Sequence, residues 1–419
     1  MIAWSESDLL IRDAVREFID RELRPHVDAL ESGEMTPYPI IRKLFSQFGI
    51  DVMAAEAVKN MLERERAKQE RGKQEHGEQS GHQQTGGIGA MGEQASMAAI
   101  LISELAGVSL GTVAAMSVSL GLGAATIAAR GTLEQKQRWL PPLVTMEKVA
   151  AWAITEPDSG SDALGGMKTY VKRDGDDYIL NGQKTFITNG PYADTVILYA
   201  KLDDGSVTDK RDREVLTFVL DSGMSGFTQG KPFRKMGMHA SPTGELFFDN
   251  VRLGSDRLLG SARQDRGAGR ESVRASFAGE RMGVAILALG IINECQRRCV
   301  EYAKNRTLWG QSIGNFQLIQ LKLARMEVAR VNVQNMVFSL IEGARAGRLP
   351  SLAEASAMKL YSSEVATEVA MDAVQLFGGN GYMTEYRVEQ LARDAKSLMI
   401  YAGSNEVQVT HIAKDLLRR

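Results

Sequence analysis

Cysteine is nearly absent from this sequence, and this scarcity excludes several classes of protein. The 419 residues include only Cys295 and Cys299, which are too few for a disulfide framework and lack the histidine or cysteine companions of a zinc site. Lys and Arg number 50 against 52 Asp and Glu, for a net charge of -2, so the basic surface that nucleic-acid binding needs is missing. We expect two buried thiols, no metal and no nucleic-acid partner.

Signals for export and for membrane insertion are also lacking. Residues 1–23 alternate charged and apolar positions as an amphipathic helix does, and not as a signal sequence does, which predicts a cytoplasmic protein. Residues 105–129 carry no charge and are long enough to span a membrane. Their many glycines, serines and threonines make them only weakly apolar, as in closely packed helices. We expect a buried pair of helices there and no membrane span.

The hydrophobic pattern changes twice along the chain. Helical periodicity covers residues 5–50 and 94–145, with Ser5 before an acidic first turn and Pro141-Pro142 closing a later helix. Short β-rich runs follow, separated by turn residues such as Asp174-Gly175. Long helical runs return from about Ser272.

This order of elements predicts an α+β multidomain protein. We expect an N-terminal all-α domain at residues 1–150, a central β domain at 151–265 and a C-terminal α-helical bundle at 266–419. Within the first domain, residues 62–87 form a polar tract with too little apolar surface to fold by itself. We expect a solvated helix end that leads into a mobile loop and is dispensable for stability.

A GxGxxG pattern at residues 87–92 follows the polar tract. The dinucleotide fingerprint needs a preceding strand that aims the turn at a pyrophosphate. Because no strand pattern precedes these glycines, we interpret them as a loop.

A loop rich in hydroxyls and glycine opens the central domain, with the sequence AWAITEPDSGSD at residues 151–162. Such a loop can hold a phosphate or a polar ring edge, although ordinary turns have the same composition. The segment resembles the signature of the acyl-CoA dehydrogenase family, and KTFITNG at 184–190 resembles that family's next motif. Four further motifs of the family follow in order: RTLWGQSIGNFQ from Arg306, QLFGGNGY from Gln375, RDAK from Arg393 and IYAGSNEVQ from Ile400.

The resemblance covers the chain except residues 52–92 and implies a flavoprotein that binds FAD. Its fold would have a helical N-terminal domain, a central β domain and a C-terminal four-helix bundle. Thr155 and Thr188 would bond the polar edge of the flavin, and Phe186 stands where the family has tryptophan. Arg306 and Gln317 would reach FAD across a subunit boundary in a homotetramer, a dimer of dimers. The expected cofactor contacts are Trp152, Thr155, Ser161, Phe186, Ile187, Thr188, Arg306, Phe316, Gln317, Gln375, Leu376, Phe377, Gly378, Gly379, Ser404 and Glu406.

The chain departs from the family at the catalytic carboxylate. Where the family commonly has IYEGT, this chain has Ala402, which cannot remove a proton. Glu280, in FAGERMG, resembles the position that carries the base in the isovaleryl and long-chain branches. The resemblance therefore implies that Glu280 is the catalytic base. The alternatives are that Glu280 is an ordinary solvated helix residue, and that Glu406 is the base.

The resemblance also implies the substrate contacts and the reaction. Arg281 would meet the CoA adenosine or its phosphates, Ser161 the pantetheine, and Ala402 and Gly403 the thioester, through a backbone amide that stabilises enolate charge. Glu280 would take the α proton while the β hydrogen leaves as a hydride to FAD, which yields a trans-2-enoyl-CoA. An electron-transfer flavoprotein would then reoxidise the FAD.

Two alternatives remain open. One is a catalytically silent or partner-dependent flavin-binding subunit, which Ala402 favours and Glu280 opposes. The other is redox chemistry on a compound that is not a thioester, which Arg281 and Ser161 oppose. The length of the acyl group does not follow from the sequence, because tertiary packing sets the depth of the pocket.

Overall fold

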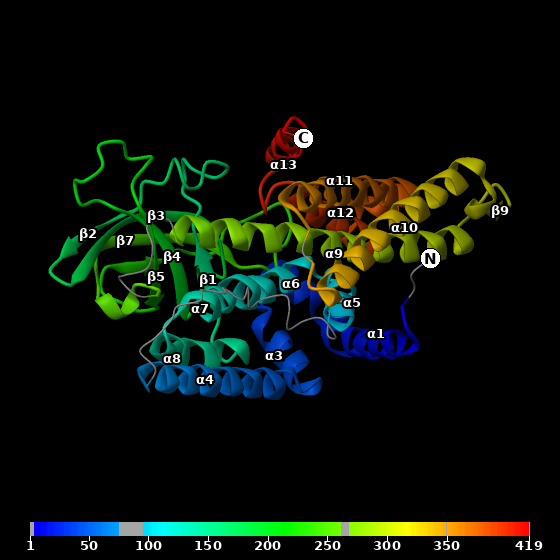
Figure 1. Ribbon diagram of the computed structural model, residues 1–419. Coiled ribbons are helices and arrows are strands. Elements are labelled where there is room, and N and C mark those ends of the chain that lie inside the picture. Colours follow the sequence, from blue (N-terminus) through cyan, green and yellow to red (C-terminus); the bar gives the residue numbers. More distant parts are fainter. Residues whose placement is uncertain (1–3, 75–94, 261–267, 349, 419) are drawn as a thin grey trace.

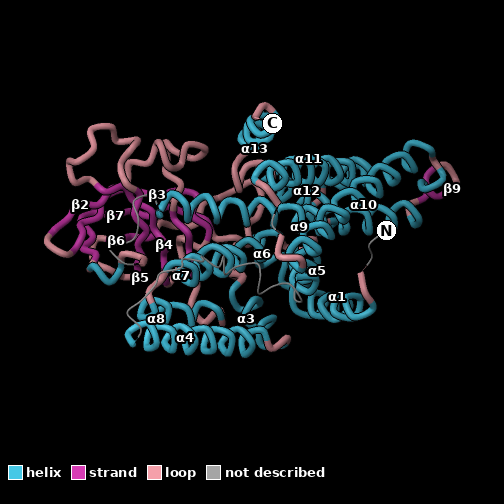
Figure 2. The backbone as a smooth tube through the Cα atoms, viewed as in Figure 1, coloured by secondary structure: helices cyan, strands magenta, loops and turns pink. Residues whose placement is uncertain are grey.

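The computed structural model describes residues 4–74, 95–260, 268–348 and 350–418. Helix α9 (Ala268–Asn305) runs from the sheet to the opposite end of the molecule (Figure 1). The N-terminal helices lie on one side of α9 and the other C-terminal helices on the other side, with the strands of the large sheet gathered at one end and a small hairpin at the opposite end (Figure 2). The observed order is helices, sheet, helices, as the sequence predicts.

The N-terminal region is helical, as its periodicity predicts. Ser5 Oγ accepts the Asp8 N–H, and the Asp8 carboxylate accepts the Ser5 N–H, both at 3.1 Å, so a capping box starts the first helix. The prediction for Pro141-Pro142 was wrong, because both lie inside α8, which continues to Val144. The helices are α1 (Glu6–Phe18), α2 (Val27–Ser32), α3 (Tyr38–Gln47), α4 (Ile50–Gln74), α5 (Ala95–Ala106), α6 (Leu110–Ser117), α7 (Ala125–Arg130) and α8 (Leu133–Val144), with a π-helical turn at Val118–Ala124.

The uncharged segment forms the end of α5 and one continuous helical stretch, Leu110–Arg130, rather than the expected pair of helices. Its glycines allow close approach: a Cβ at Gly123 would lie 2.5 Å from the Cβ of Ala150, and one at Gly111 would lie 2.8 Å from the backbone N of Ser241. By length and composition this stretch could cross a membrane, but 56% of its apolar window is buried inside the protein.

The polar tract at 62–87 is described only to residue 74, where it continues α4. We expected a solvated helix end, but the first residues of the tract contact the rest of the protein. Leu62 packs against a hydrophobic cluster, and Glu65 Oε1 accepts a hydrogen bond of 2.6 Å from the Nζ of buried Lys136. Residues 75–87, and the whole GxGxxG pattern at 87–92, lie outside the described residues.

The strands form a seven-stranded mixed sheet in the order β1-β4-β2-β3-β7-β6, with β5 on the other edge of β4. Strand β1 pairs parallel with β4, and β2 and β3 form the predicted hairpin, with Gly175 at φ 64° in its turn. The strands are β1 (Ala150–Ala153), β2 (Tyr170–Asp174), β3 (Asp177–Thr188), β4 (Thr195–Leu202), β5 (Val215–Asp221), β6 (Phe227–Gln229) and β7 (Thr243–Leu253).

The C-terminal helices begin at Ala268, slightly before the predicted start. Helices α10 (Gln317–Arg345), α11 (Leu352–Phe377) and α12 (Val388–Ser397) pack with α9, and α13 (Asn405–Leu416) lies against α11. A small hairpin, β8 (Thr307–Leu308) and β9 (Gln311–Ser312), connects α9 to α10. Cys295 and Cys299 are buried free thiols in α9, as predicted.

One hydrophobic core joins both helical regions. It contains side chains of α1, α3 and α5 together with side chains of α9 to α12. A second cluster lies within the sheet, and a third connects α4, α7 and α8 to β1 and the start of α9. The helices before and after the sheet therefore fold against each other, which brings distant motifs together.

Candidate active site

A buried ion pair fixes the hydroxyl-rich loop that follows β1. Lys184 Nζ donates to Glu156 Oε1 at 2.8 Å and to the Ile154 carbonyl at 3.0 Å. Glu156 also accepts the backbone N–H groups of Lys168 and Thr169. Burial opposes the charge of Glu156, but Lys184 and these hydrogen bonds outweigh it and lower the pKa of the carboxyl.

Both residues lie within the motifs at 151–162 and 184–190, but nothing in the sequence indicated that they pair. Burial lowers the pKa of Lys184 to about 8, against the opposing attraction of Glu156. The pair places Thr155, which is partly buried, beside β3, where the Thr155 carbonyl accepts the Thr185 N–H at 2.9 Å.

A β-bulge at the end of β3 turns Phe186 outward. The register with β7 shifts between Lys184 and Ile187, and Phe186 within the bulge has φ 56°. Its ring is 67% exposed, whereas Thr188 is partly buried. The bulge thus offers an aromatic face and a hydroxyl side by side, which suits the flat ring of a flavin.

Asn189 holds this bulge against the body of the protein. Its Nδ2 donates to the carbonyls of Ala115 and Ala150, and its Oδ1 accepts from the Tyr38 hydroxyl at 3.0 Å. Other predicted contacts are placed differently. The side chains of Trp152 and Ile187 are buried in the core, with the Trp152 Nε1 donating to Tyr199, so only their backbone can reach a ligand.

The second group of predicted FAD contacts lies at the opposite end of the molecule. Arg306 directly precedes the β8–β9 hairpin, which Figure 1 shows far from β3 along the length of α9. Arg306, Gln317, Gln375, Gly378 and Gly379 are exposed, Phe316 is partly buried, and Leu376 and Phe377 are buried. One chain therefore does not bring the two groups to a single FAD.

Glu280 is partly buried on α9. Burial raises the pKa of its carboxyl to about 7, while the positive charges of Arg281 and Lys359 act in the opposite direction. A carboxyl with this pKa can hold a proton or accept one near neutral pH, as a general base requires. The rival Glu406 is exposed on α13, and hydrogen bonds at the helix start, including one from Ser404, lower its pKa.

Lys359 connects the environment of Glu280 to α13. Its fully buried Nζ donates to Asn405 Oδ1 at 2.7 Å, and Ser363 Oγ donates to the same oxygen at 3.1 Å. Burial lowers the pKa of Lys359 to about 8, against the attraction of Glu280 and Glu406. No sequence motif indicated this lysine, because only the packing of α11 on α9 brings it to the site.

The turn before α13 has an unusual backbone. Ala402 has φ 57° and Gly403 φ 80°, and a non-glycine residue in this conformation is strained. Gln408 Nε2 holds the turn by donating to the carbonyls of Ala402 (3.1 Å) and Gly403 (2.8 Å). In the described part of the chain, the N–H of buried Ala402 donates to no backbone carbonyl, so it is available to a carbonyl oxygen of a ligand.

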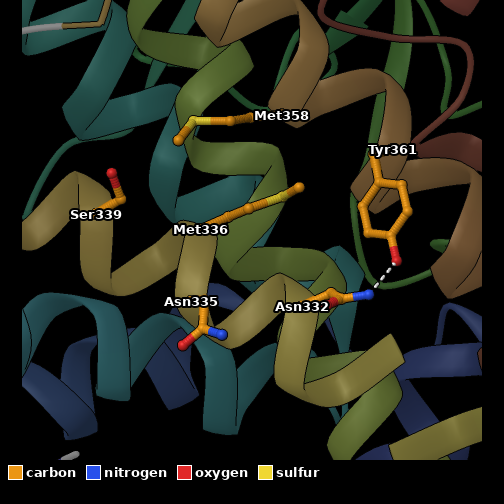
Figure 3. Close-up of a pocket in the computed structure, with 6 residues that line it drawn as sticks. All are labelled: Asn332, Asn335, Met336, Ser339, Met358 and Tyr361. Atoms are coloured by element: carbon orange, nitrogen blue, oxygen red, sulfur yellow. Dashed lines mark hydrogen bonds between the residues drawn. The ribbon is translucent and has the colours of Figure 1, made fainter. Parts of the chain in front are cut away.

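Arg281 is buried, with only 6% of its surface exposed, although it was predicted to meet CoA phosphates. Ser161 is exposed on the loop after β1. A hollow of about 510 Å³ between α10 and α11, lined by Asn332 and Tyr361 among others, contains none of the predicted site residues (Figure 3). Within the described residues, no group of three or more His, Cys, Asp or Glu side chains could hold a metal ion.

Comparison with known proteins identifies the class of this fold and site. Three family models cover most of the chain: "Acyl-CoA dehydrogenase, N-terminal domain" at residues 53–147, "middle domain" at 151–251 and "C-terminal domain" at 267–417. The chain is 33% identical to a 3-(aryl)acrylate reductase of Clostridium sporogenes, over 99% of this chain and 100% of that protein.

Two further relatives come from Megasphaera elsdenii. The chain is 38% identical to its short-chain-specific acyl-CoA dehydrogenase, over 80% of this chain and 85% of that protein. It also matches the solved butyryl-CoA dehydrogenase structure with a TM-score of 0.82 and 32% identity, over 100% of both chains. This chain belongs to the acyl-CoA dehydrogenase family, so it is an FAD-dependent oxidoreductase that acts on a CH–CH bond.

Proposed function

We propose that Glu280 is the base that removes the α proton of an acyl-CoA thioester, and that Ala402 serves through its backbone amide. The observation that carries the proposal is the pKa of Glu280, which burial raises to about 7 beside two buried cations. At the usual position of the family's carboxylate, Ala402 has no acid group, so Glu280 does not compete with a second carboxylate for a proton.

The residues of the site divide the work between proton transfer and charge stabilisation. The carboxylate of Glu280 accepts the α proton, and the N–H of Ala402 donates to the thioester oxygen as negative charge develops there. The positive charges of Arg281 and Lys359 favour the ionised form of Glu280 before the transfer. Ser161 on the exposed loop would contact the pantetheine.

FAD, when bound, accepts the β hydrogen as a hydride, and its electrons pass to an electron-transfer flavoprotein. Thr155, Phe186 and Thr188 would hold the ring. Arg306 and the Gly378–Gly379 pair would hold the phosphate end from a neighbouring chain, because they lie at the far end of α9. This separation supports a site shared between subunits, and we propose a homotetramer in the cytoplasm on the family resemblance.

The relatives guide the choice of substrate. Two of them carry the names short-chain-specific acyl-CoA dehydrogenase and butyryl-CoA dehydrogenase, so we propose a short acyl chain and take butyryl-CoA as the first compound to test. The relative named for 3-(aryl)acrylates makes an arylpropionyl thioester the second.

The test is anaerobic bleaching of the flavin by butyryl-CoA. Glu280→Gln keeps the size of the side chain and removes its proton-accepting power, so the rate of flavin reduction should fall by about 100-fold or more while FAD stays bound. Glu63→Gln, at an exposed position on α4, is the control, and wild-type rates are expected for it. If Glu280→Gln reduces its flavin at the wild-type rate, the proposal is wrong.

A reciprocal variant tests the exchange of the two positions. Glu280→Gly combined with Ala402→Glu should recover part of the lost activity, because the carboxylate then approaches the same α carbon from the turn before α13. If no acyl thioester bleaches the wild-type flavin, the chain is instead a silent subunit, and a homologous chain with its own glutamate should then co-purify with it.

A further inference from the structure

Among the buried cations of the site, Arg281 has the fewest hydrogen-bond partners in the described chain. It is 6% exposed, and its Nε–H donates to no described group. Burial lowers the pKa of its guanidinium, against the attraction of Glu280. A buried donor without an acceptor costs free energy, so the packing around Arg281 must hold this side chain in place.

That environment is the turn that carries Ala402. A Cβ built on Gly403 would lie 3.7 Å from the Nη2 of Arg281 and 2.7 Å from the Nε2 of Gln408. Both side chains therefore lie against the same turn. The Oε1 of Gln408 is a buried acceptor without a partner and the Nε–H of Arg281 is a buried donor without one, so both side chains keep an unused polar atom, which is uncommon in a protein interior.

The charged groups around Arg281 belong to the same site. Glu280 is its neighbour on α9, Lys359 faces it from α11, and His411 faces it from α13. Glu280 in turn faces Arg281, Lys359 and the partly buried Tyr401. The guanidinium thus lies against the turn and acts on the charge of the proposed base, and its low exposure makes it a poor ligand for the phosphates of a CoA that extends toward solvent.

We propose that Arg281 is a positioning residue that holds Glu280 and the Ala402–Gly403 turn in their working geometry, and that it does not bind the phosphates of CoA. The inference rests on the proposed function. It deepens that function, because it assigns Arg281 to the thioester end of the substrate, whereas the sequence assigned it to the adenosine end.

The two roles differ in which part of the substrate they affect, so two thioesters separate them. Flavin reduction is measured in the purified holoenzyme with butyryl-CoA and with S-butyryl pantetheine, which lacks the adenosine and all the phosphates. For Arg281→Gln we expect a loss of maximal rate on the order of 100-fold with both thioesters, the effect of a misplacement of about 1 Å in an active site. Arg281→Lys, which keeps the charge, should recover part of the rate.

The pH profile gives a second readout. The positive charge of Arg281 lowers the pKa of Glu280, so its removal should move the midpoint of the rate–pH profile upward, and Arg281→Lys should move it less. Arg64→Gln, at an exposed site on α4, is the matched control and should alter neither the rate nor the profile.

A different result would overturn the inference. If the effect of Arg281→Gln is a raised half-saturation concentration for butyryl-CoA that disappears with S-butyryl pantetheine, Arg281 binds the CoA end. If Arg281→Gln fails to retain FAD, the same turn is tested with Gln408→Leu. The inference is wrong if Gln408→Leu keeps the wild-type rate with both thioesters. A wild-type flavin that neither thioester bleaches would instead contradict the proposed function, before any variant is made.

Discussion

Lys184 and Glu156 form an ion pair of 2.8 Å that is almost completely buried, with 0% and 4% of their side chains exposed. The pair joins the last third of β3 to the loop after β1, and both segments carry predicted flavin contacts. Its function is therefore to fix the position of Thr155 relative to Phe186 and Thr188.

Glu156→Gln should destabilise the protein by about 3 kcal/mol and weaken FAD binding, because it leaves the Lys184 ammonium buried without a counter-charge. Thermal unfolding followed by flavin fluorescence measures both effects. Asp158→Asn is the matched control, since the Asp158–Lys168 pair is exposed and solvent screening leaves such a pair with little effect on stability. Equal effects of the two variants would contradict the structural role of the buried pair.

The rate of flavin reduction should rise with pH through about 7, because Glu280 must be ionised to accept a proton and burial raises its pKa to about that value. Lys359→Met removes a charge that lowers this pKa, so the midpoint should move upward. Stopped-flow measurement of flavin reduction by butyryl-CoA, between roughly pH 5.5 and 9, gives this midpoint. Lys359→Arg keeps the charge and is the control. If it shifts the midpoint as far as Lys359→Met does, the effect is not electrostatic.

Gly290→Ala should destabilise the protein by roughly 1–3 kcal/mol, the cost of overpacking. A Cβ there would lie 2.1 Å from the Ser103 carbonyl oxygen, where α5 crosses α9. Gly283→Ala on the same helix is the control, because its Cβ would meet nothing within 4 Å. That variant should be neutral or more stable by up to about 1 kcal/mol, through helix propensity. Urea unfolding compares the two.

Glu294→Gln should cost roughly 2–3 kcal/mol of unfolding free energy at pH 7. Burial opposes ionisation of Glu294, but hydrogen bonds from Arg297 and the charges of Arg24 and Arg298 outweigh it and lower its pKa to about 2.

Because this folded pKa lies below that of the unfolded chain, the stabilisation is present above about pH 4.5 and is lost as the pH falls toward 2. The difference in stability between the wild type and Glu294→Gln should therefore shrink over that interval. Glu301→Gln, whose carboxylate is 66% exposed, should show no such dependence.

The order of helices and strands could be predicted from the sequence, because the apolar period is a local property. Ser5 before an acidic turn indicates the start of α1, and Asp174-Gly175 indicates the hairpin, with no knowledge of distant residues. The prolines at 141 and 142 were misread because a helix tolerates proline where packing holds its last turn. The family was also visible in the sequence, because its motifs are contiguous strings of residues.

The environments of the site residues could not be predicted in the same way. The pKa of Glu280, the proposed base, is about 7 because packing removes its carboxyl from water, while Lys359, which α11 brings toward it, acts in the opposite direction. Arg281, on α9, is buried against the turn before α13, which lies roughly a hundred residues or more further along the chain. The sequence by itself determined which chemical groups the chain carries and which elements they occupy. Only the tertiary structure decided which of them lose water and which charges they face, because desolvation and Coulomb interactions depend on distances in space.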